Sequence, residues 1–193
     1  MRPDLQKPCG GKAKGFTVTG ALEQISRRYG PHVVKDFART LPDEFRTPIE
    51  NGLLLPASWI PMELYFYVVQ YLVDRFHNGD AKAAVDLGKW TAGENIGVFF
   101  KAVLSFTSPA MVINLSGRFW KSYYDVGELK VVLNEKGRVA AELSSWPFDD
   151  EVSMNEIGGS FLAYLEKSRA KDVKLVSAVA VRPNVLRYDV TYS

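Results

Sequence analysis

The alternation of apolar residues in the last third of the chain is the feature that most constrains its fold. Leu129, Val131 and Leu133 occupy every second position, and a polar run at 134–137 that ends in glycine leads to a second alternating run at 139–143. A period of two is typical of a strand with one buried face, and a short turn containing glycine between two such runs indicates an antiparallel hairpin. The segments 173–181 and 185–192 predict a second hairpin.

A helical segment separates the two hairpins. Asp149 and Asp150 can cap it, and its apolar residues recur with the helical period at Val152, Ile157 and Phe161. The order is therefore β-β-α-β-β, which predicts a four-stranded antiparallel sheet with helices on one face.

The front of the chain has helical periodicity instead. We expect helices from Thr19-Gly20 to 29, from 31 to about 41, from 61 to 77, from 81 towards 104 and from 109 to about 120. Prolines and a glycine between 42 and 56 indicate a long connection. The helix at 61–77 is apolar nearly all round, which is typical of a domain centre or of half an oligomer interface. The fold class predicted is α+β, an N-terminal helical layer packed on the four-stranded sheet.

The chain length of 193 residues suits one domain with a substantial core. Residues 1–15 lack apolar periodicity and predict a flexible tail, leaving a single α+β domain over 16–193. Cys9, the one cysteine, lies in this tail and has no partner for a disulfide. The net charge of +2 gives no reason to expect nucleic-acid binding, and no apolar run is long enough to enter a membrane. We therefore expect a cytoplasmic protein.

Three glycines inside the segment from 81 towards 104 suggest an unusual helix. Gly88, Gly93 and Gly97 each weaken a helix interior relative to alanine. Their presence predicts close helix packing, a kink or a break.

An ordered set of short segments resembles a known group of proteins. The segments are Val18-Thr19-Gly20, Ser58-Trp59-Ile60-Pro61, Asp86-Leu87-Gly88, Ser108-Pro109, Phe119-Trp120-Lys121-Ser122-Tyr123-Tyr124-Asp125-Val126-Gly127 and Tyr188-Asp189-Val190-Thr191-Tyr192. The set is similar to an uncharacterised family of conserved hypothetical proteins from myxobacteria and their relatives. That family resembles the superfamily of haem–NO-binding domains, 4-vinyl-reductase domains and TRAPP tethering subunits.

The resemblance implies helices over an antiparallel sheet, dimerisation through helices, and a small apolar or acyl ligand between helices and sheet. It does not carry over haem, since the proximal histidine and the Tyr-x-Ser-x-Arg motif of haem–NO domains have no match here. No cofactor is expected.

Aromatic residues supply the main candidates for a ligand pocket. They gather in the helical half and where it meets the sheet. An apolar pocket and ordinary core packing both explain such a cluster, and core packing is the more common reason for one. The candidate pocket residues, with one acidic residue among them, are Trp59, Tyr65, Phe66, Trp90, Glu94, Phe99, Phe100, Trp120, Tyr123 and Tyr124. Asp125 and Gly127 are expected to form a structural turn, with Gly127 at positive φ.

Catalytic and metal-binding patterns are weak in this sequence. His32 and His77 are the only histidines, and neither has metal-ligand spacing to a cysteine or an acidic residue. No Gly-x-Ser-x-Gly elbow is present, so no catalytic residue or metal site is predicted. Three functions stay open: a non-catalytic sensor or interaction module, a protein–protein adaptor with a filled core, and an enzyme acting on a small aromatic compound. The enzyme would need a pocket residue of strongly perturbed pKa, such as Glu94 or His77.

Overall fold

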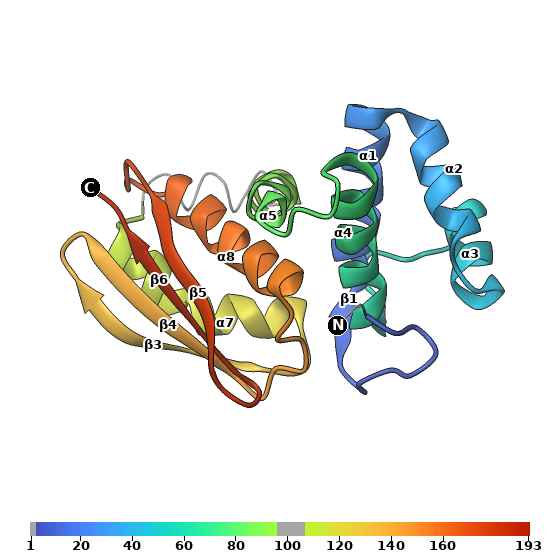
Figure 1. Ribbon diagram of the computed structural model, residues 1–193. Coiled ribbons are helices and arrows are strands. Elements are labelled where there is room, and N and C mark those ends of the chain that lie inside the picture. Colours follow the sequence, from blue (N-terminus) through green and yellow to red (C-terminus); the bar gives the residue numbers. More distant parts are fainter. Residues whose placement is uncertain (1–2, 96–106) are drawn as a thin grey trace.

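A computed structural model describes residues 3–95 and 107–193 (Figure 1). Helices dominate up to residue 123, and strands with one long helix follow. The helices are α1 (Gly15–Tyr29), α2 (Pro31–Arg39), α3 (Asp43–Glu50), α4 (Met62–Phe76), α5 (Ala83–Asn95), α7 (Pro109–Tyr123) and α8 (Glu151–Glu166). The strands are β1 (Lys12–Lys14), β2 (Trp59–Pro61), β3 (Glu128–Glu135), β4 (Arg138–Ser144), β5 (Lys174–Arg182) and β6 (Val185–Thr191).

Both predicted hairpins are confirmed. Strands β3 and β4 pair antiparallel, as do β5 and β6, and β4 joins β6 to give a four-stranded sheet in the order β3-β4-β6-β5. Gly137 and Asn184 turn the two hairpins at positive φ, which these two residue types tolerate better than most. Helix α8 lies between the hairpins in the chain, and the Asp150 side chain accepts a hydrogen bond from the Ser153 N–H at its start.

The helices that lie directly on the sheet are α7 and α8 (Figure 1). Helix α5 packs on the other side of α8, while α1 to α4 form a further layer away from the sheet (Figure 1). The mixed α and β class is confirmed. Of the predicted N-terminal helical layer, α7 lies on the sheet, but the helices α1 to α5 do not cover it as predicted. The reason is that α8 is buried on more than one face, so it packs against the sheet and α5 together.

Close backbone contact joins α5 to α8. A Cβ atom added at Gly88 would lie 2.0 Å from the Glu156 carbonyl oxygen, and one added at Gly159 would lie 1.9 Å from that of Val85. The close helix packing predicted from the glycines is therefore confirmed at Gly88. At Gly93 an added Cβ would meet only the Ala163 methyl group, at an ordinary 3.9 Å, and Gly97 lies outside the described residues.

The N-terminal segment differs from the flexible tail that was expected. Strand β1 pairs antiparallel with β2, and Leu5 is buried in the core. Helix α1 begins at Gly15, not near Gly20. A residue with a side chain does not fit at its first position, because a Cβ on Gly15 would lie 2.1 Å from the Leu55 carbonyl oxygen. Sequence periodicity could not predict this contact between segments 40 residues apart.

The connection expected after residue 42 contains a helix. Helix α3 has Asp43 and Glu44 in its first turn, where negative charge is favourable, and Pro42 immediately precedes it. Pro48, which suggested a loop, is accommodated within this short helix. Residues 43–50 of the predicted long connection are therefore helical.

The turn that follows α7 is built as predicted around Asp125 and Gly127. The Lys12 N–H donates to Asp125 Oδ1 at 2.6 Å, and the Trp120 Nε1–H donates to the Val126 carbonyl at 3.0 Å. Gly127 has φ +78°, and a Cβ there would lie 2.9 Å from the Trp146 ring. The turn thus ties β1 and the Trp120 indole to the start of the sheet.

Replacing Gly127 with alanine is expected to cost about 2–3 kcal/mol of unfolding free energy, because both the backbone strain and the crowding oppose a side chain. Urea unfolding measures this. Gly52→Ala is the matched control, since Gly52 also has positive φ but no atom within 4 Å of the added Cβ. We expect it to cost about 1 kcal/mol. Equal losses in the two variants would show that the crowding at Gly127 is relieved without cost.

Candidate ligand-binding cavity

A cavity of about 110 Å³ lies between α7, α8 and the inner face of the sheet. Its volume is of the same order as that of an engineered apolar cavity of about 150 Å³ that is known to bind benzene. The residues that line the cavity are Thr17, Tyr65, Ala92, Val112, Ile113, Ser116, Phe119, Trp120, Tyr123, Tyr124, Leu129, Val131, Val139, Ala141, Glu156, Ile157, Ser160, Phe161, Tyr164, Leu165, Tyr188 and Val190.

Helix α7 provides one wall of the cavity through its own sequence period. Ser108 caps the helix by accepting from the Met111 N–H, and Pro109 occupies its first turn. From this start Val112, Ser116 and Phe119 recur at helical spacing and point along one face into the cavity. The strands supply the opposite wall with alternate residues, such as Leu129 and Val131 of β3. Most of the lining is therefore apolar or aromatic.

The Glu156 carboxyl group is the exception in this apolar lining. The residue is 1% exposed. Its Oε1 accepts from the Tyr65 hydroxyl at 2.6 Å and from the Ser160 hydroxyl at 3.0 Å, whereas its Oε2 is buried without a hydrogen-bond partner. Burial raises the pKa of Glu156 to about 7, although the two hydrogen bonds act in the opposite direction. A carboxyl group with one free oxygen thus faces the cavity.

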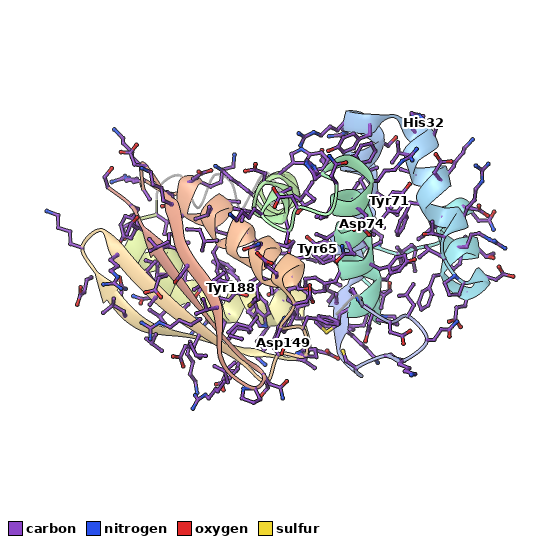
Figure 2. The ribbon with its side chains drawn as sticks, viewed as in Figure 1. His32, Tyr65, Tyr71, Asp74, Asp149 and Tyr188 are labelled. Atoms are coloured by element: carbon purple, nitrogen blue, oxygen red, sulfur yellow. The ribbon has the colours of Figure 1, made fainter. Side chains whose placement is uncertain are left out.

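Tyrosine hydroxyl groups surround this carboxyl group from several elements. The Tyr188 hydroxyl, on β6, is buried without a hydrogen-bond partner. The Tyr164 hydroxyl, on α8, donates a hydrogen bond to the Tyr123 hydroxyl, on α7, at 2.6 Å. Burial, followed by the nearby Glu156 carboxyl, raises the pKa of Tyr65, Tyr124 and Tyr188 well above 10. These hydroxyls therefore stay protonated and can donate hydrogen bonds. Figure 2 labels Tyr188, which comes from β6 of the sheet, and Tyr65, which comes from α4.

The structure brings four of the predicted pocket residues together. Tyr65, Trp120, Tyr123 and Tyr124 all line the cavity.

Three other predicted pocket residues lie elsewhere. Trp59 is 41% exposed on β2, where the Lys14 ammonium lies over its ring. Phe66 packs in the core against Trp146 and Phe148, and Trp90 is half-buried beneath the Arg28 guanidinium. The Glu94 side chain and all of Phe99 and Phe100 lie outside the described residues.

Sequence reasoning missed the polar centre of the cavity. Glu156 lies four residues after Val152 and seven before Ala163, both buried. An acidic residue in register with the apolar face of a helix was a signal that could have identified it. Tyr164 and Tyr188 gave no comparable signal, because aromatic residues are ordinary in helices and strands.

The fold is similar to that of H-NOX proteins of known structure. An H-NOX protein from S. oneidensis in the Fe(II)NO state aligns over 93% of this chain and 99% of its own, with 12% identity and a TM-score of 0.69. Unliganded Fe(II) H-NOX from K. algicida aligns over 93% and 96%, with 9% identity and a TM-score of 0.66. An oxygen-binding H-NOX domain related to soluble guanylate cyclases aligns over 93% and 95%, with 10% identity and a TM-score of 0.65.

No protein-family model matches the chain, and no curated protein matches its sequence. At such low identities the likeness shows a shared fold and no more.

Haem, which similar structures contain, does not fit the residues of this cavity. The described lining has no histidine, cysteine, lysine or arginine. His32 is exposed on α2, far from Tyr188 in Figure 2, and His77 ends α4. Tyrosine could ligate iron only as phenolate, which the raised pKa values oppose, and Glu156 would repel the haem carboxylates.

The described residues hold no candidate metal cluster and no helix able to span a membrane. Within them no three His, Cys, Asp or Glu side chains come together in a group that could hold a metal ion. Among the helices at 3–95 and 107–193, none combines the length and apolar character needed to cross a bilayer. Cys9 lies outside the cavity, and desolvation beside Glu63 raises its pKa to about 11.

Proposed function

We propose that this chain is a non-catalytic sensor or interaction module that holds a small apolar or acyl ligand between its helices and its sheet. The observation that carries this proposal is the cavity itself, which is apolar, aromatic and positioned where α7, α8 and the sheet meet. Its volume is close to that needed by a single aromatic ring. The proposal places the chain with the superfamily of haem–NO-binding, 4-vinyl-reductase and TRAPP domains, while excluding haem as its ligand.

Binding is supported over catalysis by the groups around Glu156. A carboxyl group with a pKa of about 7 in a pocket is what an acid or base catalyst requires, and it is the observation that favours an enzyme. A reaction that both adds and removes a proton by separate groups would also need a second acid or base that titrates near neutral pH. The tyrosine hydroxyls have pKa values raised well above 10, and the described lining offers no histidine, cysteine or lysine. Glu156 acts alone, which suits recognition of a ligand.

Filling the cavity is expected to abolish binding of a small apolar probe. Ala141 lines the cavity from β4, so Ala141→Phe would place a ring where the ligand is proposed to lie. We expect toluene to bind the native chain and to raise its melting temperature, and to have no such effect on Ala141→Phe. Differential scanning calorimetry with and without toluene measures both.

The matched control is Ala180→Phe, which adds the same ring at an exposed position of β5. It should keep the response to toluene. An equal response of Ala141→Phe and the native chain would refute the cavity as the binding site. Native mass spectrometry of the purified protein, followed by denaturation, would also reveal any ligand retained from the cell as mass that is lost.

A second candidate, a protein–protein adaptor, is favoured by the exposed apolar residues of one edge strand. Val176, Val179 and Val181 are 62%, 45% and 47% exposed on β5, the last strand of the sheet order. An apolar edge strand invites pairing with another strand. The homodimer through helices implied by the resemblance stays a prediction, and the native mass spectrum measures it directly.

A further inference from the structure

The unpartnered oxygen of Glu156 indicates what kind of ligand the cavity takes. Buried polar atoms are hydrogen-bonded in most proteins, and leaving one unpaired is costly. Glu156 Oε2 has no partner, although Oε1 of the same carboxyl accepts two hydrogen bonds. The Tyr188 hydroxyl, which also lines the cavity, has no partner either. Two unsatisfied groups at one apolar cavity are therefore available to a ligand.

The charge of the lining selects among ligands. Glu156 is the only ionisable carboxyl group among the described lining residues, and no cationic side chain accompanies it there. A buried carboxylate needs a positive partner, and the described residues offer no cluster that would hold a metal ion beside it. An organic cation with hydrogen-bond donors would supply both the charge and the missing hydrogen bond.

An ammonium group matches the remaining features of the site. It carries three N–H donors and accepts no hydrogen bond. One donor can serve Glu156 Oε2 and another the Tyr188 hydroxyl oxygen, while nearby aromatic faces attract the charge. The rest of the cavity, lined by Phe119, Trp120 and Phe161, suits an apolar ring.

We propose that the ligand is a small arylalkylamine, a primary amine on an alkyl carbon that bears an aromatic ring, its ammonium group held by Glu156 and Tyr188 and its ring by the aromatic lining. This inference rests on the proposed function, because it names the ligand class of the same cavity.

Three probes of nearly equal size test it: benzylamine, which is cationic; benzyl alcohol, which is a neutral donor; and toluene, which has no polar group. Isothermal titration calorimetry at neutral pH measures their affinities. We expect benzylamine to bind the native chain roughly ten-fold or more tightly than benzyl alcohol. Glu156→Gln, which keeps the shape but removes the charge, should weaken benzylamine roughly 10- to 100-fold and leave toluene unchanged.

The matched control is Glu63→Gln. Glu63 is also buried with one unpartnered oxygen, but it does not line the cavity, so this variant should bind all three probes as the native chain does. Toluene binding without a preference for benzylamine, or a preference that survives in Glu156→Gln, would overturn the amine while leaving the cavity as a binding site. Failure of all three probes to bind would overturn both proposals.

Discussion

Gly159→Ala is expected to lose at least about 3 kcal/mol of unfolding free energy, enough to leave a domain of ordinary stability largely unfolded in mild denaturant. The new Cβ would lie 1.9 Å from the Val85 carbonyl oxygen and 2.9 Å from the Lys89 backbone nitrogen. Backbone atoms inside a helix cannot rotate away, so α5 and α8 would have to move apart. Urea unfolding monitored by circular dichroism measures the loss, and soluble yield reports it if the variant does not fold.

Gly93→Ala is the contrasting variant in the same pair of helices. There the added methyl would meet only the Ala163 methyl at 3.9 Å, and alanine favours a helix over glycine. We expect a gain of up to about 1 kcal/mol. If Gly159→Ala were as stable as the native chain, the close approach of α5 and α8 would be wrong. A large loss of unfolding free energy in Gly93→Ala would mean that α5 and α8 come into close contact near Gly93.

Glu156→Gln is expected to change how stability depends on pH. Because folding raises the pKa of Glu156 from 4.5 to about 7, the folded chain holds a proton that the unfolded chain releases near pH 4.5. The contribution of this group to stability is therefore present below pH 4.5, declines as pH rises, and is lost above about pH 7. Over this rise in pH, the native chain should lose about 3 kcal/mol of unfolding free energy from the ionisation of Glu156. The Glu156→Gln variant should not lose it, because glutamine does not ionise.

Urea unfolding of both chains at pH 5 and pH 8 measures the effect. The two should have similar stability at pH 5, and Glu156→Gln should be the more stable by up to about 3 kcal/mol at pH 8. The histidines are the same in both chains, so their titration cancels in the difference. The tyrosines facing Glu156 stay protonated over this range, because burial and the carboxyl raise their pKa values. Parallel pH profiles would show that Glu156 is solvated in solution.

Local sequence patterns predicted the parts of the fold that depend on neighbouring residues. The hairpins followed from period-two alternation and turn residues, the start of α8 from Asp150, and the start of α7 from Ser108 and Pro109. The errors arise from contacts distant in sequence. Pairing with β2 orders residues 12–14, and the stacking order of the layers depends on backbone contact between α5 and α8.

The candidate site was predicted in outline, without its polar centre. Tyr65, Trp120, Tyr123 and Tyr124 were chosen as aromatic residues near the junction of helices and sheet, and the fold does bring them to one cavity. The sequence alone could not distinguish these four cavity residues from Phe66, an equally aromatic residue that packs in the core against Trp146. Glu156 becomes distinctive only when its burial and its free oxygen are known, and both depend on packing from elements distant in the sequence.

The glycine contact between α5 and α8 makes the two helical walls of the cavity mechanically unequal. The wall formed by α8 is stiff, because its backbone rests directly against that of α5, in the most extensive contact between any two described helices. The wall formed by α7 touches α8 much less, and the Tyr164–Tyr123 hydrogen bond bridges the two. When the contents of the cavity change in size, we therefore expect α7 to move more readily than α8. The turn at Gly127 connects α7 to β3, which lies at the edge of the sheet.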